Sequence, residues 1–314
     1  MGNTLYLVVP CYNEEEVLPE TSKRLREIMS GLIGEGKISP ESRICFVDDG
    51  SRDRTWELID ELHRQDPVFC GVKLSRNRGH QNALLGGMMT VREDCDALIS
   101  LDADLQDDPQ AIVPMVDKWL EGTDVVYGVR SARKTDTFFK RFTAEGFYKV
   151  MEWMGAKVVF NHADYRLLSR RALDALAEYR EVNLFLRGMV PTLGYPTAVV
   201  TYERNERFAG ESKYPLKKML ALAWNGITSF STRPLDLIVT AGIILAAVAS
   251  LMLLVCGGRA IWGTAPGAVE VFSYSLWLLG GIQLIALGVV GEYVGKIYSE
   301  AKGRPRYIIE SYLK

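Results

Sequence analysis

Short apolar runs and segments with helical spacing alternate along the first 130 residues of the chain. The apolar runs are residues 4–9, 43–47, 69–74, 97–101 and 124–128. The helical segments between them are residues 14–29, 55–64, 82–91 and 110–120. Strands that alternate with helices in this way are typical of a parallel sheet with helices on both faces. The pattern therefore predicts an α/β domain, in which ligands bind at the carboxyl ends of the strands.

Beyond residue 130 the pattern is less regular. Residues 130–165 are basic and aromatic, residues 166–179 have helical spacing, and residues 183–200 contain a helix punctuated by Gly and Pro and a short strand. Residues 214–230 have one apolar face and one polar, lysine-bearing face. This pattern is typical of a helix lying at a bilayer surface, and an ordinary core helix has it too.

Two long uncharged stretches follow, Leu237–Gly258 and Val271–Gly291. A helix needs roughly 20 apolar residues to cross the hydrocarbon core of a bilayer. The two stretches therefore predict two transmembrane helices.

Basic residues flank this pair of stretches, whereas the loop between them carries only Arg259 and Glu270 as charged residues. The flanking basic residues are Arg233, Lys296, Lys302, Arg304 and Arg306. Because basic residues favour the cytoplasmic side, both termini are expected in the cytoplasm. The sequence thus predicts a multi-pass protein of the cytoplasmic (inner) membrane.

Composition limits the classes of partner. The chain has 37 Lys and Arg against 39 Asp and Glu, a net charge of −2, so it lacks the basic footprint of a nucleic-acid-binding protein. Its five cysteines form no C-x-x-C pair, which favours reduced core cysteines.

The strongest chemical signal is Asp102-Ala103-Asp104, directly after the apolar run 97–101. Two carboxylates in this spacing beyond a strand end can bind one Mg²⁺ or Mn²⁺ ion, which completes its shell with water and phosphate oxygens. Such an ion would neutralise a departing diphosphate. Because Asp107 and Asp108 follow, a loop of solvated acids is the alternative interpretation.

A second acid pair, Asp48-Asp49-Gly50-Ser51, follows the run 43–47. A carboxylate there can accept hydrogen bonds from a base or from ribose hydroxyls. Alternatively, Ser51 or Asp53 caps the helix predicted at residues 55–64, and both interpretations can hold together.

The first strand ends in Pro10-Cys11-Tyr12-Asn13-Glu14. Tyr12 can stack on a base, and Asn13 and Glu14 can form hydrogen bonds with it. By itself this segment also fits a simple junction between a strand and a helix.

The order of these motifs resembles a known family. After the motifs at residues 10–14 and 48–51 come Asn77-x-Gly79 and Asp102-Ala103-Asp104-Leu105-Gln106, then His162-Ala163-Asp164-Tyr165-Arg166 and Gly210-Glu211-Ser212-Lys213-Tyr214. The chain is similar to the inverting family 2 glycosyltransferases with a GT-A fold. Over its whole length it resembles the polyprenyl-phosphate glycosyltransferases, such as dolichyl-phosphate mannose synthases and bactoprenol glucosyltransferases.

The resemblance implies a fold and a domain order. The fold is α/β, a Rossmann-like, mixed and mainly parallel sheet with helices on both faces, followed by amphipathic interface helices and two transmembrane helices. The implied segments are a cytoplasmic GT-A domain at 1–213, a juxtamembrane amphipathic helix at 214–232, a two-helix transmembrane hairpin at 233–295 and a cytoplasmic tail at 296–314. The tail segment Lys302–Lys314 is a candidate for pairing with a neighbouring copy, so a homo-oligomer stays open.

The resemblance also implies roles for single residues. The nucleotide sugar is expected at Pro10, Tyr12, Asn13, Glu14, Asp48, Asp49, Asp102, Ala103 and Gln106. A Mg²⁺ or Mn²⁺ ion is expected at Asp102, Asp104 and Gln106. The phosphate of the lipid acceptor is expected at Arg130, Lys140, Arg141, Arg207, Ser212 and Lys213. Some relatives carry a hydroxyl residue near Ala144, and this chain does not.

Physical chemistry supports these roles. An acceptor phosphate must lie beside an already anionic donor, and Arg and Lys side chains offset the repulsion. The alternative interpretation of the basic residues is attraction to anionic lipid. Asp104 and Asp164 are the expected catalytic residues. Since a phosphate acceptor is largely dianionic near pH 7, with a second pKa of about 6, Asp164 is expected to orient the sugar rather than act as a strong base.

The expected reaction is transfer of a sugar from a nucleotide-diphosphate donor to undecaprenyl phosphate with inversion. The resemblance favours UDP-glucose or UDP-N-acetylglucosamine as the donor. One alternative is a processive polysaccharide synthase, although such enzymes usually carry Q-x-x-R-W and the chain has no Arg-Trp pair. Another is a catalytically silent anchor that binds nucleotide sugar, against which the intact acid motifs argue.

Overall fold

The computed structural model describes residues 3–130, 162–182, 184–203 and 268–314, with single positions at 235, 237, 238, 240 and 244. The chain divides into two compact units. The first comprises Met1–Lys149, Lys157–Pro215 and Arg304–Lys314, and the second comprises Val150–Ala156 and Leu216–Gly303.

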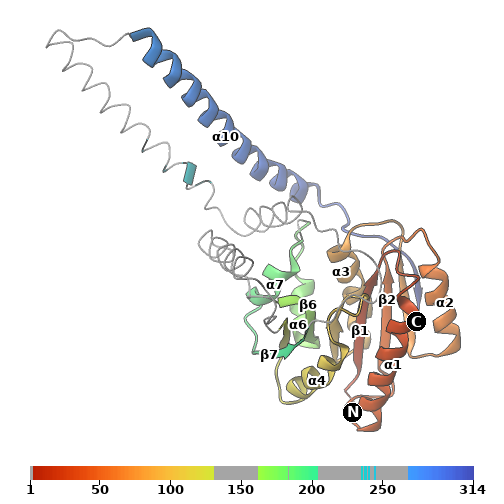
Figure 1. The fold of residues 1–314 in the computed structure, drawn as a ribbon. Coiled ribbons are helices and arrows are strands. Elements are labelled where there is room, and N and C mark those ends of the chain that lie inside the picture. Colours follow the sequence, from red (N-terminus) through yellow and green to blue (C-terminus); the bar gives the residue numbers. More distant parts are fainter. Residues whose placement is uncertain are drawn as a thin grey trace. The chain divides into compact units, whose positions relative to one another are not determined.

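A mixed eight-stranded sheet forms the centre of the first unit (Figure 1). The strands are β1 (Leu5–Cys11), β2 (Arg43–Asp48), β3 (Phe69–Leu74), β4 (Ala97–Ser100), β5 (Val125–Arg130), β6 (His162–Ser169), β7 (Thr197–Tyr202) and β8 (Ile309–Leu313). Their order is β7-β5-β6-β4-β1-β2-β3-β8. Strands β4, β1, β2 and β3 are parallel, and so are β5 and β7, whereas β6 and β8 are antiparallel to their neighbours. The predicted mixed, mainly parallel sheet is therefore confirmed.

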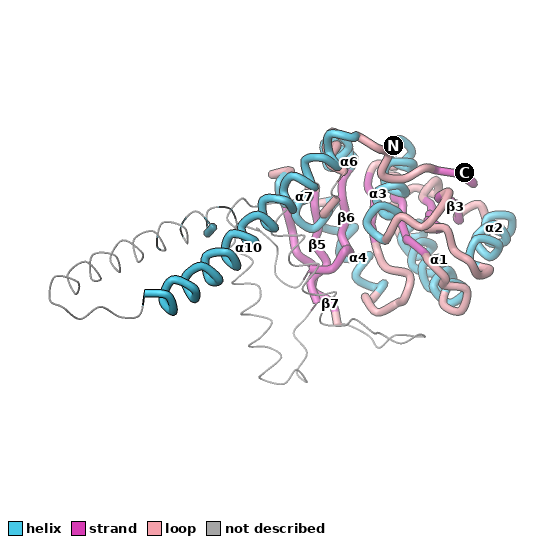
Figure 2. Tube along the Cα trace, turned by 90° about the horizontal axis from the view of Figure 1, so that it is seen from above, coloured by secondary structure: helices cyan, strands magenta, loops and turns pink. Residues whose placement is uncertain are grey.

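Helices cover both faces of this sheet (Figure 2). Helix α1 (Leu18–Gly34) contacts both α2 (Thr55–Gln65) and α4 (Ile112–Leu120), and α3 (His80–Val91) contacts α6 (Arg170–Ala177). The remaining described elements of the first unit are the helix α7 (Leu186–Thr192) and two short 3₁₀ turns, Arg92–Asp94 and Pro109–Ala111.

Alternation along β1 divides the core between the two faces. Leu5, Leu7 and Val9 are buried in a cluster that includes residues of α1. Val8 points toward α3, where a Cβ atom on Gly87 would lie only 2.8 Å from Val8 Cγ1. Because Gly87 has no side chain, α3 packs closely on the sheet. The amino terminus of α3 is thereby held near the carboxyl ends of the strands.

Residues 166–169 correct one prediction. Helical spacing predicted a helix from residue 166, but residues 166–169 complete β6, and the helix α6 begins at Arg170. β6 pairs with both β4 and β5, so tertiary pairing overrides the local spacing. Ser169 then caps α6, because its hydroxyl accepts a hydrogen bond from Ala172 N at 3.2 Å.

The described part of the second unit is chiefly the long helix α10 (Ala268–Lys302), which contains the apolar stretch 271–291. The first apolar stretch, 237–258, has only four described positions, and residues 214–230 lie outside the described residues. Among the described residues, no helix combines the length and the apolarity needed to cross a membrane. This finding contradicts the predicted multi-pass location in the cytoplasmic membrane.

The carboxyl-terminal segment returns to the first unit. β8 pairs with β3 of its own chain, and Lys73 Nζ lies 3.1 Å from Glu310 Oε1. The ring of Tyr307 packs against Gly86 of α3 at a distance that leaves little room for a side chain there.

Candidate active site

Three predicted motifs lie at one edge of the sheet. The ends of β1 and β2 are in register, with Cys11 opposite Asp48, and Val8 of β1 is opposite Ser100 of β4. The turns that follow these three strands therefore start side by side. This arrangement is the one that parallel strands impose on ligand sites in α/β sheets.

The side chains of Asp48 and Asp49 stabilise the turn after β2 through hydrogen bonds to backbone N–H groups. Asp49 Oδ1 accepts a hydrogen bond from Arg78 N at 2.7 Å, and Asp49 Oδ2 accepts one from Gly79 N at 2.9 Å. Asp48 is fully buried, and its Oδ1 accepts a hydrogen bond from Ser51 N at 3.1 Å. Burial raises the pKa of both carboxyl groups. Asp49 thus fixes the backbone just before α3.

The N-cap position of α2 is Arg54, which forms no side-chain cap, and Asp53 instead binds the first helical residue, Thr55. Asp53 Oδ1 accepts hydrogen bonds from Thr55 N at 3.1 Å and from Thr55 Oγ1 at 2.6 Å. Ser51 has another partner, since its hydroxyl accepts a hydrogen bond from Asn13 N at 3.0 Å.

The turn after β1 is bound to the turn after β2. Asn13 adopts φ 55°, and its side-chain oxygen accepts a hydrogen bond from Arg52 N at 2.9 Å. Glu14 N donates to Thr55 Oγ1 at 2.9 Å. Tyr12 remains 41% exposed, so its ring is accessible, whereas Pro10 lies inside β1. An open hollow of about 460 Å³ adjoins this turn and is lined by Asn13, Glu14, Glu15, Glu16, Val17, Arg52 and Asp53.

The turn after β4 carries the D-x-D motif. Asp102 Oδ1 is buried and has no hydrogen-bond partner among the described residues. Asp104 Oδ1 accepts a hydrogen bond from Gln106 N at 3.1 Å around Leu105, whose φ is 55°. Ala103 is buried, and its carbonyl oxygen accepts a hydrogen bond from Thr21 Oγ1 at 2.8 Å.

The electrostatics of this turn suit a cation. Burial raises the pKa of Asp102; His80 opposes this shift, and the neighbouring Asp164, Asp107 and Asp104 reinforce it. Within the described residues, no three His, Cys, Asp or Glu side chains are placed to hold a metal ion. However, Asp102 offers a buried oxygen without a hydrogen-bond partner, and carboxylate and amide oxygens are suitable ligands for Mg²⁺ or Mn²⁺. The donor set therefore fits a divalent ion that takes its other ligands from a substrate.

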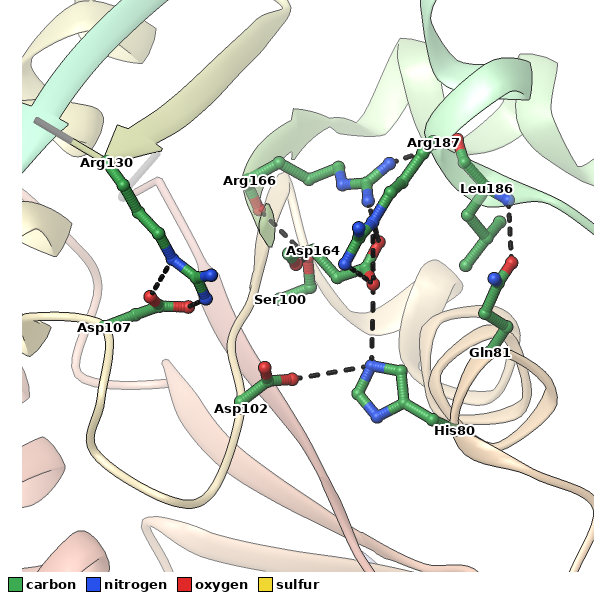
Figure 3. A network of polar contacts seen from close by, with 10 residues as sticks. All are labelled: His80, Gln81, Ser100, Asp102, Asp107, Arg130, Asp164, Arg166, Leu186 and Arg187. Carbon is green, nitrogen blue, oxygen red and sulfur yellow. Dashed lines mark hydrogen bonds and ion pairs between the residues drawn. The ribbon is translucent and has the colours of Figure 1, made fainter. Parts of the chain in front are cut away.

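Asp164 is joined to this turn through His80 (Figure 3). His80 is the first residue of α3, and its Nε2 lies 3.4 Å from Asp102 Oδ1 and 3.8 Å from Asp164 Oδ2. Asp164 is only 6% exposed and pairs with Arg166 and Arg187. Burial raises the pKa of Asp164, but Arg166, Arg187 and His80 outweigh that effect and lower it well below its usual value. Asp164 is therefore a carboxylate that is held ionised.

Arg130 is bound to a neighbouring acid. Its Nε donates to Asp107 Oδ1 at 2.9 Å and its Nη2 to Asp107 Oδ2 at 3.1 Å, as Figure 3 shows. Asp107 is almost fully buried. Burial lowers the pKa of Arg130, but the hydrogen bonds and charge of Asp107 raise it above its ordinary value. The pair thus links the end of β5 to the turn after β4.

The other residues expected at the acceptor phosphate lie outside the described residues. They are Lys140, Arg141, Arg207, Ser212 and Lys213.

Sequence reasoning missed several members of the site. His80 was not among the predicted site residues, although it directly follows the Asn77-x-Gly79 motif and lies 3.4 Å from Asp102. Asp107 was interpreted only as a solvated acid. Nothing in the sequence singles out Arg187, because it belongs to no recognisable motif.

Comparison with known proteins identifies the family. Residues 6–177 match Glycosyl transferase family 2. The chain is 49% identical over 306 residues to an uncharacterized glycosyltransferase, YkoT, of Bacillus subtilis, covering 98% of this chain and 91% of the relative. It is 40% identical over 312 residues to a bactoprenol glucosyl transferase of Shigella phage SfX, covering 97% and 98%.

The chain is also similar to a solved structure, glucosyl-3-phosphoglycerate synthase from Mycobacterium tuberculosis in complex with Mn²⁺, UDP-glucose and phosphoglyceric acid. The TM-score is 0.46 at 17% identity, covering 72% of this chain and 78% of that one. The family match covers more than half of the 314 residues and includes the turns after β1, β2 and β4 together with Asp164. The sequence resemblance is thereby confirmed, and the chain belongs to glycosyl transferase family 2 as a glycosyltransferase with a GT-A type, Rossmann-like sheet.

Proposed function

We propose that the protein transfers a single sugar from UDP-glucose or UDP-N-acetylglucosamine to undecaprenyl phosphate, with inversion at the anomeric carbon. The observation that carries this proposal is the 40% identity to a bactoprenol glucosyl transferase across 97% of this chain and 98% of the relative. Such coverage includes every motif at the strand ends. A shared acceptor class is therefore the simplest account of the shared sequence.

The donor site is assigned to the turns after β1, β2 and β4. The exposed ring of Tyr12 can stack on uracil, beside the hollow lined by Asn13 and Glu14. Asp49 is engaged by Arg78 N and Gly79 N, so its contribution to nucleoside binding acts through the shape of that turn.

Asp102, Asp104 and Gln106 would hold a Mg²⁺ or Mn²⁺ ion together with oxygens of the donor diphosphate. Such an ion, when bound, stabilises the negative charge that develops on the diphosphate. The buried Oδ1 of Asp102, which accepts no hydrogen bond among the described residues and lies 3.4 Å from His80 Nε2, supports this assignment.

The acceptor phosphate is assigned to the basic residues that begin at Arg130. Its oxygen forms a bond to the anomeric carbon from the face opposite the diphosphate, and UDP leaves with the electron pair of the broken C–O bond. An acceptor whose second pKa is about 6 is already ionised near pH 7 and needs no strong base. Asp164, whose pKa is lowered, is a weak proton acceptor and is better suited to orienting a sugar hydroxyl.

A direct test uses the purified full-length protein with radiolabelled UDP-glucose or UDP-N-acetylglucosamine, undecaprenyl phosphate and Mn²⁺ or Mg²⁺. The expected product is a labelled lipid whose mass corresponds to one added sugar. The reaction without undecaprenyl phosphate is the control. A ladder of longer products would instead support a processive synthase, and absence of labelled lipid with both donors would contradict the proposal.

A further inference from the structure

The two carboxylate oxygens of Asp164 differ in their main neighbours (Figure 3). Oδ1 is bound by Arg166, which lies two residues later on the same strand, and it also accepts a longer hydrogen bond from Arg187 Nε at 3.4 Å. Oδ2 accepts hydrogen bonds from Arg187 Nη2 at 3.1 Å and from Arg187 Nε at 3.3 Å. Oδ2 is also the oxygen that lies 3.8 Å from His80 Nε2. Because His80 Nε2 lies 3.4 Å from Asp102, Oδ2 is on the donor side of the site.

The two arginines differ in burial and origin. Arg166 has no exposed surface and also donates to the carbonyl oxygen of Leu186 at 3.1 Å, so it belongs to the interior. Arg187 is 35% exposed and reaches Asp164 from a separate element, α7. Truncating Arg187 therefore removes a partner of Asp164 without leaving a closed cavity.

The position of Arg187 is fixed through the residue before it. Leu186 N donates to Gln81 Oε1 at 2.9 Å, and the Leu186 carbonyl oxygen accepts from Arg166. Both backbone polar groups of Leu186 are thus engaged by side chains of α3 and β6. These two bonds fix the backbone at the start of α7, so the guanidinium of Arg187 extends from a fixed position toward Asp164.

We propose that Arg187 is a positioning residue of the transfer reaction. It holds Asp164 Oδ2 in the direction in which this oxygen accepts a hydrogen bond from a hydroxyl of the donor sugar. A planar guanidinium that binds a carboxylate through two N–H groups fixes the orientation of that carboxylate, which a single charge does not. This inference rests on the proposed function and adds to it a residue that acts through Asp164.

The first test compares Arg187→Gln and Arg187→Lys with the wild type, with UDP-glucose or UDP-N-acetylglucosamine and undecaprenyl phosphate. In Arg187→Gln, kcat is expected to fall by about 30-fold, with the KM for undecaprenyl phosphate within about twofold, because a misdirected carboxylate impairs the reacting geometry. Arg187→Lys is expected to have a higher kcat than Arg187→Gln and a lower one than the wild type, since lysine keeps the positive charge but lacks the planar pair of N–H donors. A large rise in that KM with kcat unchanged would mean that Arg187 binds the acceptor directly and would overturn the proposal.

The second test is a double-mutant cycle with Asp164→Asn. If Arg187 acts through Asp164, the double variant is no slower than Asp164→Asn alone, to within about twofold. Losses that multiply would overturn the proposal. The first test needs no variant at Asp164, so it decides the question even where Asp164→Asn folds poorly.

Arg171→Gln is the matched control. Arg171 pairs with Asp124, a carboxylate that is 10% exposed and precedes β5, at the edge of the sheet opposite the site. The same substitution there removes an arginine from a mostly buried acid and is expected to leave kcat within about twofold of the wild type. An inactive wild type would refute the proposed function, whereas an active wild type matched by Arg187→Gln would refute only the role of Arg187.

Discussion

The acid turns after β2 and β4 look alike in sequence and differ in the structure. In the β2 turn, both oxygens of Asp49 accept hydrogen bonds from backbone N–H groups of the segment before α3. In the β4 turn, Asp102 Oδ1 is buried with no hydrogen-bond partner among the described residues and faces His80. The first turn is therefore closed at Asp49, although Asp48 Oδ2 is buried without a hydrogen-bond partner among the described residues, and the second turn is incomplete at Asp102. Asp102 differs from Asp48 because His80 links it to Asp164. An acid after a buried strand therefore indicates a function only when it is unsatisfied and lies beside other polar groups of a site.

The largest effect is expected in the incomplete turn. Asp102→Asn and Asp104→Ala should each reduce transfer by roughly 10³-fold or more, because they remove charge that holds the diphosphate-bound ion. The thermal unfolding midpoint of Asp102→Asn should stay within about 3 °C of the wild type, since Asp102 Oδ1 accepts no hydrogen bond among the described residues, whereas Asp104→Ala also loses the hydrogen bond from Gln106 N. Transfer assays and thermal unfolding of the same preparations measure both. Near-normal turnover of either variant would refute the assignment of the metal site.

The closed turn should instead respond in stability. Gly50 has φ 68°, and a Cβ atom there would lie 2.6 Å from Asn77 N and 2.7 Å from the Arg76 carbonyl carbon. Gly50→Ala is expected to lower the free energy of unfolding by about 2–4 kcal/mol, because it combines a strained backbone with a backbone clash. Denaturant unfolding measures the change.

Gly36→Ala is the control for Gly50→Ala. Gly36 has a similar φ of 70°, with nothing within 4 Å of the added Cβ atom. Gly36→Ala should therefore lower the free energy of unfolding only through the unfavourable backbone conformation, by about 1 kcal/mol. Equal losses at the two positions would show that the packing of Gly50 on the segment before α3 contributes nothing.

Asp49→Asn is expected to have a smaller effect on stability. The amide side chain keeps one oxygen acceptor and loses the other, so one of the N–H groups of Arg78 and Gly79 loses its bond. The expected cost is about 1–2 kcal/mol in the free energy of unfolding. Transfer should fall together with the folded fraction and recover at lower temperature. A variant as stable as the wild type would show that water replaces this carboxylate.

The smallest effect is expected from Asp48→Asn and depends on pH. Burial raises the pKa of Asp48 in the folded protein above its usual value of 3.8. Wild-type stability therefore falls as pH rises from the unfolded pKa through the folded pKa, and the loss persists above it. Because Asn has no charge, the variant should gain stability relative to the wild type at pH 7 and lose this gain at pH 3. A difference in unfolding free energy that is independent of pH would contradict this.

Local pattern predicted most of the first 130 residues correctly. The five apolar runs became β1 to β5, and the acids after β2 and β4 lie at the same edge of the sheet. Residues 166–169 of β6 were mistaken for the start of a helix, because they are held in the sheet by pairing with strands distant in sequence. The predicted membrane location was also wrong, since no described helix has the length and apolarity to cross a bilayer.

The sequence by itself determined the α/β pattern, the three strand-end motifs and the glycosyltransferase family, because strand period, turn residues and motif order are local properties of the chain. Only the tertiary structure decided which acids are satisfied and which are not. Asp49 accepts hydrogen bonds from backbone N–H groups about 30 residues away, and Asp164 pairs with Arg187 from a separate helix. Hydrogen bonding and charge compensation depend on distance in space, and the spacing of residues along the chain does not encode that distance.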